Sequence, residues 1–155
     1  MYCPAGNRQD ERLVLLALIA SCPLATLITN GPQGLMANLI PMQVGQSANG
    51  EGVLHAHLAR ANPQCAELAA GAEVLVLFQG PQAYITPAWY ASKAQHGKAV
   101  PTWNYAMVQV RGAARVIDDR EWIRAQVTAL SQLQEQAFDH PWQVADAPEA
   151  YIDAM

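Results

Sequence analysis

The alternation of hydrophobic and polar positions predicts a buried helix at the start of the chain. Residues 13–20 form a continuous apolar run, and Asn7 together with Asp10 supplies a capping box ahead of it. Pro23 cannot continue a helix, so the helix is expected to end at Cys22. The run is too short to span a bilayer, which takes about 20 apolar residues.

Short apolar segments separated by turn residues predict strands over the following part of the chain. Turn residues gather at 30–34 and 48–52, and Gly112 marks a bulge or a close approach inside the last alternating segment. Runs of this kind are typical of strands that bury one or both faces. The predicted strands cover residues 24–29, 35–44, 53–58, 73–79 and 105–117.

Two further helices are predicted from their boundary signals. Asn62 and Pro63 open a short helix, and Gly71 closes it. Asp118 is placed to cap an amphipathic helix over residues 119–138, whose apolar side chains recur at helical spacing. The first of these helices therefore starts directly after a predicted strand.

These elements together predict one mainly β domain over residues 1–155, with flanking helices and a peripheral tail at 140–155. At 155 residues, of which 52% are hydrophobic, the chain supports one core but not two. Several closely spaced strands favour a closed antiparallel barrel over a parallel sheet with crossover helices. The sequence contains no glycine-rich dinucleotide or P-loop motif.

Charge is distributed unevenly along a chain whose net charge is −4. Residues 60–115 hold five basic and two acidic side chains, whereas the segment from Asp118 onward holds two basic and eight acidic ones. A small anion suits the positive middle, although a randomly uneven surface explains the same counts. Direct DNA binding is not supported, because it needs a broad basic surface.

The cysteines and the start of the chain favour a reducing cytoplasm. Cys3, Cys22 and Cys65 are odd in number and widely spaced, which argues against a disulfide framework or a zinc site. The residues before the first apolar run are neutral overall, whereas a signal peptide carries a positive segment there. We therefore expect a cytoplasmic protein with no membrane anchor.

Residues 80–105 concentrate two tryptophans, three tyrosines and two lysines between three prolines. Proline interrupts helices and central strands, so irregular backbone is expected here, with aromatic rings beside ammonium groups. A planar, phosphorylated ligand fits that chemistry. Lys93 and Ser92 supply a charge and a hydroxyl donor for an anion, and Thr102 to Tyr105 supply rings and polar groups for a flat ligand. A solvated lysine, and aromatic rings that close a barrel end or a subunit interface, are the alternatives.

Arg60 is the first candidate for anion binding. It lies between the end of a predicted strand and the Asn62-Pro63 helix start, where its guanidinium and the backbone N–H groups after Pro63 are expected to converge on one phosphate. An exposed arginine beside an asparagine that only caps its own helix explains the same spacing. The residues alone leave both interpretations open.

His55 and His57 are separated by one residue in a predicted strand, so both imidazoles are expected on one face, as a metal pair requires. A third ligand is missing nearby, and His96 reaches them only through folding. Hydrogen-bonded or ligand-lining histidines are therefore favoured, and no metal site is predicted.

Two motifs in the chain resemble the PaiB family of FMN-binding negative transcriptional regulators, which belongs to the FMN-binding split-barrel group. One is His57-Leu58-Ala59-Arg60-Ala61-Asn62-Pro63 and the other is the aromatic segment 80–105. The resemblance implies an antiparallel, Greek-key-like split β-barrel that forms a homodimer with FMN at the subunit interface. The cofactor-binding residues that it implies are His57, Arg60, Asn62, Ser92, Lys93, Thr102, Trp103, Asn104 and Tyr105.

The resemblance also has a gap at its end. It extends through Ala147-Pro148-Glu149-Ala150-Tyr151, whereas family members continue into a further strand and a Lys-Leu-Ser-Gln-Asn segment with no counterpart before Met155. An incomplete barrel with a more open flavin pocket is therefore expected. An FMN-dependent oxidoreductase of a small molecule and a cofactor-free dimeric barrel are the alternatives. A non-enzymatic role is favoured, because no acid/base constellation identifies a substrate.

Overall fold

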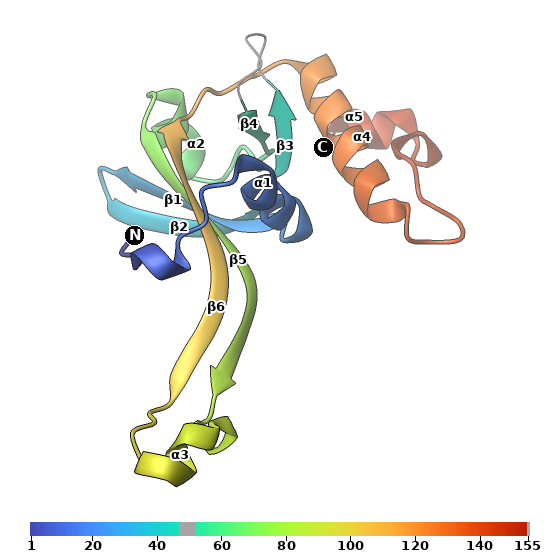
Figure 1. Ribbon diagram of the computed structural model, residues 1–155. Helices are drawn as coiled ribbons and strands as arrows, with labels where there is room; N and C mark the ends of the chain where they lie inside the picture. The colour runs from blue at the N-terminus through green and yellow to red at the C-terminus, as the bar shows by residue number, and fades with distance from the viewer. Residues whose placement is uncertain (47–51, 155) are drawn as a thin grey trace.

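The computed structural model describes residues 1–46 and 52–154, and strands form its centre (Figure 1). The turn predicted at 48–52 falls almost entirely on residues 47–51, outside the described residues. In the described parts of the chain, no helix is long and apolar enough to cross a membrane.

The first helix, α1 (Arg12–Ser21), begins later than its capping signal suggests. Asn7 belongs to a separate 3-10 turn, η1 (Ala5–Asn7), in which its N–H donates to the carbonyl of Pro4 at 2.9 Å. The chain then extends, and Glu11 stands at the N-cap of α1 instead of Asn7. The predicted capping box is therefore wrong, whereas the end of the helix before Pro23 is confirmed.

The strands form two antiparallel sheets. The larger sheet has the order β2-β1-β5-β6, and the smaller sheet pairs β3 with β4. Among the described residues the two sheets share no strand pairing, so the mainly β class is confirmed but the closed barrel is not. The strands are β1 (Leu24–Gly31), β2 (Gly34–Pro41), β3 (Gln43–Gln46), β4 (Gly52–His55), β5 (Glu73–Ile85) and β6 (Thr102–Ala113).

The hairpin of β1 and β2 closes through a two-residue turn, because Gly31 pairs with Gly34 across Pro32 and Gln33. Gly34 has a φ of 92°, a conformation that side chains other than glycine rarely adopt. The hairpin and its glycine are thus confirmed, but the single strand predicted over residues 35–44 is wrong, because β2 ends at Pro41 and Gln43 begins β3 in the other sheet.

Strands β5 and β6 extend far beyond the sheet as a two-stranded ribbon, contrary to the irregular backbone expected for residues 80–105 (Figure 1). β1 pairs with β5 only as far as Leu77, so the outer part of β5 has β6 as its single partner. A register shift between Gln79 and Gln82 accommodates Pro81, which a central strand would not tolerate. We call residues 80–105 the arm. Its tip holds the 3-10 turn η2 (Pro87–Trp89) and the helix α3 (Ala91–His96).

Gly112 was the expected site of a bulge or a close approach, and neither is found there. It pairs with Val74 in regular register, and no described atom lies within 4 Å of the position that a Cβ would take. The bulge falls instead at Gly80 and Pro81, where the second neighbour of β5 has ended.

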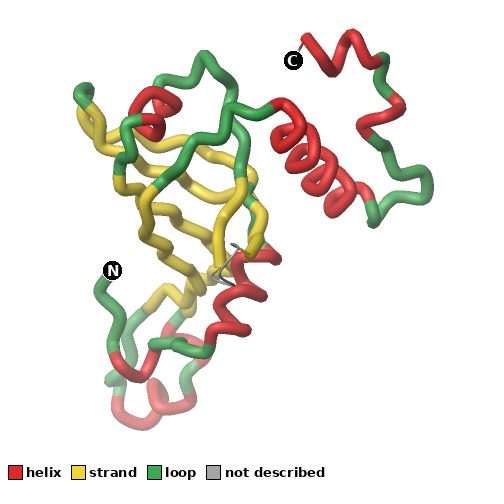
Figure 2. Tube along the Cα trace, turned by 90° about the horizontal axis from the view of Figure 1, so that it is seen from above, coloured by secondary structure: helices red, strands yellow, loops and turns green. Residues whose placement is uncertain are grey.

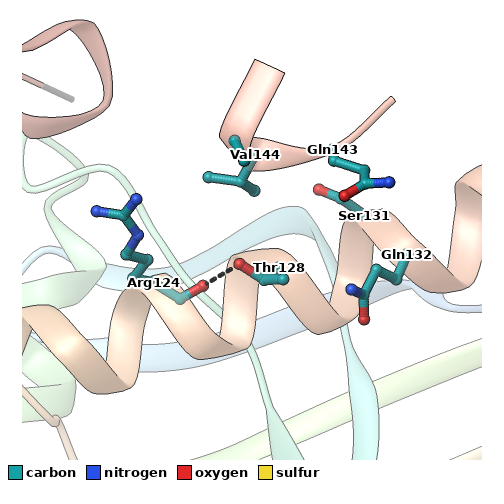
Figure 3. Close-up of a pocket in the computed structure, with 7 residues that line it drawn as sticks. Arg124, Thr128, Ser131, Gln132, Gln143 and Val144 are labelled. Carbon is teal, nitrogen blue, oxygen red and sulfur yellow. Dashed lines mark hydrogen bonds between the residues drawn. The ribbon is translucent and has the colours of Figure 1, made fainter. Parts of the chain in front are cut away.

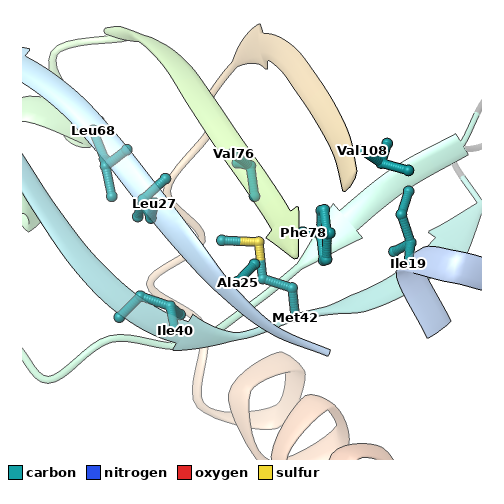
Figure 4. Packing of buried hydrophobic residues seen from close by; sticks show 9 residues of the cluster. All are labelled: Ile19, Ala25, Leu27, Ile40, Met42, Leu68, Val76, Phe78 and Val108. Carbon is teal, nitrogen blue, oxygen red and sulfur yellow. The ribbon is translucent and has the colours of Figure 1, made fainter. Parts of the chain in front are cut away.

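The hydrophobic core lies between one face of the larger sheet and the helices α1 and α2 (Gln64–Ala69) (Figure 4). α1 contributes Ile19 and α2 contributes Leu68, while Phe78 of β5 is fully buried between them and the strands. The buried cluster consists of Ile19, Ala25, Leu27, Ile40, Met42, Leu68, Val76, Phe78 and Val108.

The C-terminal part forms a helical module that stands beside the strands (Figures 1 and 2). It contains α4 (Arg120–Glu135), the 3-10 turn η3 (Val144–Asp146) and α5 (Glu149–Ala154). Asp119 caps α4 by accepting a hydrogen bond from the N–H of Trp122 at 2.7 Å, so the cap predicted at Asp118 is wrong by one residue. Asp118 is thereby left to contact another part of the molecule.

Candidate functional site

The residues predicted to bind a cofactor fall into two groups at opposite ends of β5 and β6. His57, Arg60 and Asn62 lie in the loop between β4 and α2, next to the start of β5. The other six residues lie on the arm, where β5 ends and β6 begins. β5 has 13 residues, and at roughly 3.3 Å per residue it covers about 40 Å. Within one chain the two groups therefore lie far apart along the strands.

The loop group is held by a buried polar cluster beneath α2. Gln64 is 0% exposed, and its Nε2 donates to Thr29 Oγ1 at 3.1 Å and to the carbonyl of Leu27 at 3.3 Å. Its Oε1 accepts a hydrogen bond from Asn38 at 2.9 Å. These bonds fix the first turn of α2, and with it the preceding loop, to the hairpin of β1 and β2.

Asn62 organises the start of α2, as predicted. Its Oδ1 accepts a hydrogen bond from the N–H of Gln64 at 3.0 Å, and Pro63 already has helical φ and ψ angles of −57° and −26°. The N–H groups of Cys65 and Ala66 donate to the carbonyls of Asn62 and Pro63. The backbone N–H groups that were expected to reach an anion therefore have acceptors within the chain, and anion binding here depends on side chains.

Arg60 forms a two-pronged ion pair with Asp118. Its Nη1 and Nη2 donate to the two carboxylate oxygens of Asp118 at 3.1 and 2.6 Å, and both side chains are exposed, at 80% and 64%. The hydrogen bond from Arg60, followed by its charge, lowers the pKa of Asp118 below its ordinary value of 3.8. The cation predicted to hold a phosphate is thus paired with a carboxylate from the segment after β6.

The two histidines near the loop face the helical module. His57 Nδ1 lies 2.8 Å from Gln126 Oε1, and the ring of His55 meets the ring of Trp122 edge-on, with centroids 5.4 Å apart. The backbone leaves the sheet after His55, so the expectation that both imidazoles lie on one strand is wrong. Among residues 1–46 and 52–154, no group of three metal-ligating side chains occurs.

The arm presents its aromatic rings to solvent in the single chain. Tyr84 and Trp103 stand opposite each other on β5 and β6, with ring centroids 5.9 Å apart, and they are 51% and 55% exposed. Trp103 Nε1 donates to Gln82 Oε1 at 2.8 Å, which fixes the indole across the ribbon. Lys93 lies in the last turn of α3, and Ser92 beside it is half-buried.

Cavities formed by described residues lie elsewhere in the molecule. One of about 150 Å³ lies between α4 and η3, lined among others by Arg124, Thr128, Ser131 and Gln143 (Figure 3). A second of about 280 Å³ is lined by residues of α1, β3, β4 and α4. None of the nine predicted cofactor residues lines either cavity. We call the loop group and the arm group the two half-sites.

Asp118 and Gln126 are contacts of the site that sequence reasoning missed. The sequence pattern indicates only a helix cap for Asp118 and only a position in an amphipathic helix for Gln126. Both lie 58 or more positions along the chain from their partners Arg60 and His57. No local sequence signal connects residues so far apart.

A family model described as "Putative FMN-binding domain" matches residues 1–155 of the chain. The chain belongs to this FMN-binding domain family. "Protease synthase and sporulation protein PAI 2" of Bacillus subtilis is 38% identical over 141 residues, which cover 91% of this chain and 65% of that protein. A protein of Emericella nidulans is 32% identical over 190 residues, covering 100% of this chain and 76% of the relative. The predicted PaiB-like family and FMN as its cofactor are thereby confirmed.

The fold has a counterpart among solved structures. The FAD and heme binding protein from Mycobacterium smegmatis superimposes with a TM-score of 0.67 over 94% of this chain and 63% of that chain, at 19% sequence identity. This similarity supports the antiparallel split-barrel-like fold. The chain spans less than two thirds of that protein and of the Bacillus relative.

The two half-sites together suit FMN. The loop offers the guanidinium of Arg60 for a phosphate, and the arm offers the ammonium of Lys93, the hydroxyl of Thr102 and the exposed ring of Trp103. A flavin mononucleotide needs both kinds of group, because it joins a flat aromatic system to a dianionic phosphate. The loop and the arm each carry side chains that fit part of the cofactor.

Proposed function

We propose that the protein is a cytoplasmic FMN-binding homodimer in which the loop of one copy and the arm of the other hold one flavin. The observation that carries this proposal is the separation of the two half-sites along β5 and β6, about 40 Å by strand rise. In a dimer with two-fold symmetry, the loop of each copy lies beside the arm of the other copy, so this arrangement occurs twice. Each dimer then holds two equivalent flavins.

The outer face of the larger sheet supports the dimer. Leu35 and Leu39 on β2 are 78% and 62% exposed, and Ala37 lies between them on the same face. Ile28 pairs with Ala37 on one side and with Leu75 on the other, so the apolar strip continues across three strands. A contiguous apolar face of this kind marks an interaction surface, and in a symmetric dimer it buries itself against its own copy.

Within the shared site, Arg60 of one copy binds the phosphate and Lys93 of the other adds a second positive charge. Trp103 and Tyr105 contact the isoalloxazine or the ribityl chain, with Thr102, Asn104 and Ser92 as hydrogen-bonding neighbours. Asn62 keeps the loop in place through its bond to Gln64. His57 orients the loop toward α4 through Gln126.

A regulatory role that depends on flavin binding is favoured over catalysis. The Bacillus relative is named a protease synthase and sporulation protein, and we extend a regulatory role to this chain by its similarity to the PaiB family. Bound FMN supplies a redox-active ring system. The chain carries a net charge of −4, so regulation through direct DNA contact is not part of the proposal.

Titration of FMN and riboflavin into wild type and Arg60→Ala tests the phosphate assignment. Loss of a charged, two-pronged contact should weaken FMN by about 1.5–3 kcal/mol, roughly tenfold to a hundredfold, while riboflavin binding changes little. Arg8→Ala, which removes the same charge from the N-terminal turn, is the control. Equal weakening of both ligands by Arg60→Ala would show that Arg60 does not bind the phosphate.

A further inference from the structure

The helical module and the segment just before it contact the end of β4 and the loop that carries Arg60 at three points. The ring of His55 meets Trp122, His57 bonds to Gln126, and Arg60 pairs with Asp118. Gln126 Nε2 also approaches Gln43 Oε1 on β3 at 3.5 Å. The contacts between α4 and this region of the strands thus centre on the segment predicted to bind the flavin phosphate.

The attachment of the module is loosely packed. A cavity of about 280 Å³ lies between α4 and the strands, with Ala129 and Leu133 on one side and Met42, Val44 and α1 on the other. Apolar side chains on the two sides of this cavity therefore lack the close contacts that hold a core together. Leu133 itself is 47% exposed. The remaining links are polar or aromatic, and the Arg60–Asp118 pair is exposed to water, where ion pairs contribute little. A module held in this way is easily released.

Asp118 and a phosphate compete for the same guanidinium. Asp118 occupies Nη1 and Nη2 of Arg60, the fork that binds a phosphate in two-pronged geometry. A phosphate dianion on Arg60 therefore displaces the carboxylate, or lies close enough to repel it. Either outcome breaks the contact that holds the segment just before α4 to the loop.

Taking the proposed FMN site as its basis, we propose that the flavin phosphate and Asp118 exclude each other at Arg60, so that FMN binding loosens the helical module from the strands. The coupling is reciprocal. The factor by which the Asp118 contact weakens FMN binding equals the factor by which bound FMN weakens the attachment of the module. The helical module is then the part of the molecule through which flavin occupancy is reported to a partner.

The variant Asp118→Asn separates this coupling from the rest of the site. It should bind FMN about twofold to tenfold more tightly than wild type and riboflavin equally well, because only the phosphate meets Asp118. The matched control is Asp139→Asn, which removes the same charge from an exposed position beyond the end of α4. It should leave the affinity for both ligands unchanged.

Hydrogen–deuterium exchange over residues 120–135 provides a readout that needs no flavin. In the absence of ligand, Asp118→Asn should exchange about twofold to tenfold faster there than wild type, and FMN should accelerate exchange in wild type but not in the variant. Riboflavin, which lacks the phosphate, should leave wild-type exchange unchanged.

The outcomes distinguish the coupling from the binding site. If Arg60→Ala weakens FMN selectively but Asp118→Asn changes neither FMN affinity nor exchange, the phosphate site stands and the coupling is wrong. Slower exchange of α4 with FMN also overturns the coupling, because the module is then tightened. If wild type binds no FMN, the proposed site and the coupling fall together.

Discussion

The strands β5 and β6 have an inner half, which belongs to the four-stranded sheet, and an outer half, which belongs to the arm. The two halves serve different purposes. In the inner half, Phe78 is 0% exposed and belongs to the same buried cluster as Val108 and Ile19 of α1. In the outer half, Tyr84 and Trp103 contact each other across the ribbon and are each more than half exposed. The inner half stabilises the single chain, whereas the rings of the outer half lack cover within that chain. Exposed aromatic rings on a rigid ribbon indicate a surface that another molecule completes.

The largest expected effect is the loss of core packing in the inner half. Phe78→Ala should lower the free energy of unfolding by about 3–5 kcal/mol, because it removes a fully buried ring and leaves a cavity. Tyr84→Ala, on the outer half of the same strand, should cost less than about 1 kcal/mol per chain. Urea denaturation at a concentration where wild type is monomeric measures both. Similar losses for the two variants would remove the distinction between the halves.

The second effect concerns the sheet face that is proposed to form the dimer. Leu39→Arg should weaken association by about 2–4 kcal/mol, because an unpaired charge would be buried at the interface, while the folded chain tolerates it at a position that is 62% exposed. Light scattering should report twice 16.8 kDa for wild type and 16.8 kDa for the variant. Leu13→Arg is the control, since α1 packs on the opposite face of the sheet. A wild-type monomer at micromolar concentration would contradict the dimer.

Local sequence signals predicted the hairpin and the short helix well. The pattern predicted β1, the turn and the start of β2, and Asn62 and Pro63 marked the start of α2, whereas the break between β2 and β3 was not predicted. These signals succeed because a turn or a cap depends on residues close in sequence. The chemistry of the aromatic segment and the motif around Arg60 likewise indicated the cofactor class that the family match confirms.

The long-range features were not predictable from the same signals. The sequence predicts that Pro81 interrupts a strand. It is tolerated because β1 no longer pairs with β5 at this point, and that depends on tertiary structure. The pairing of Arg60 with Asp118 and the division of the predicted site into two half-sites also depend on contacts between distant segments. Sequence composition indicates which groups suit a flavin, but not how the fold distributes them.

A third and smaller effect compares one glycine in each region. Gly71, with φ of 77°, ends α2 at the base of β5, and Gly97, with φ of 67°, ends α3 at the tip of the arm. Gly71→Ala should lower the free energy of unfolding by about 1 kcal/mol, because alanine is strained at positive φ. Gly97→Ala should cost clearly less, since fraying of α3 relieves the strain locally. Thermal melts of the two variants decide whether the arm is energetically separate from the rest.

The smallest effect is a pH dependence of the link between the strands and the helical module. The pKa of Asp118 is lowered by Arg60, so its contribution to stability is present above 3.8, the ordinary value, and is lost as pH falls through the lowered pKa. Wild type should therefore be more stable than Asp118→Asn at neutral pH, and this difference in stability should disappear only under acid conditions. An NMR titration of the Asp118 carboxyl gives the pKa directly. A pKa at or above 3.8 would show that the pair does not persist in solution.

Complementation between two defective chains tests the shared site most directly. Arg60→Ala disables the loop half-site, and the double variant Lys93→Ala/Trp103→Ala disables the arm half-site, so each protein alone should bind FMN weakly. Equal mixing with subunit exchange should restore wild-type affinity in about one quarter of all sites, because each mixed dimer joins one intact loop to one intact arm. Fluorescence titration of the mixture with FMN measures that fraction. Absence of any tight binding after confirmed subunit exchange would show that loop and arm of the same chain form the site, and would contradict the shared flavin.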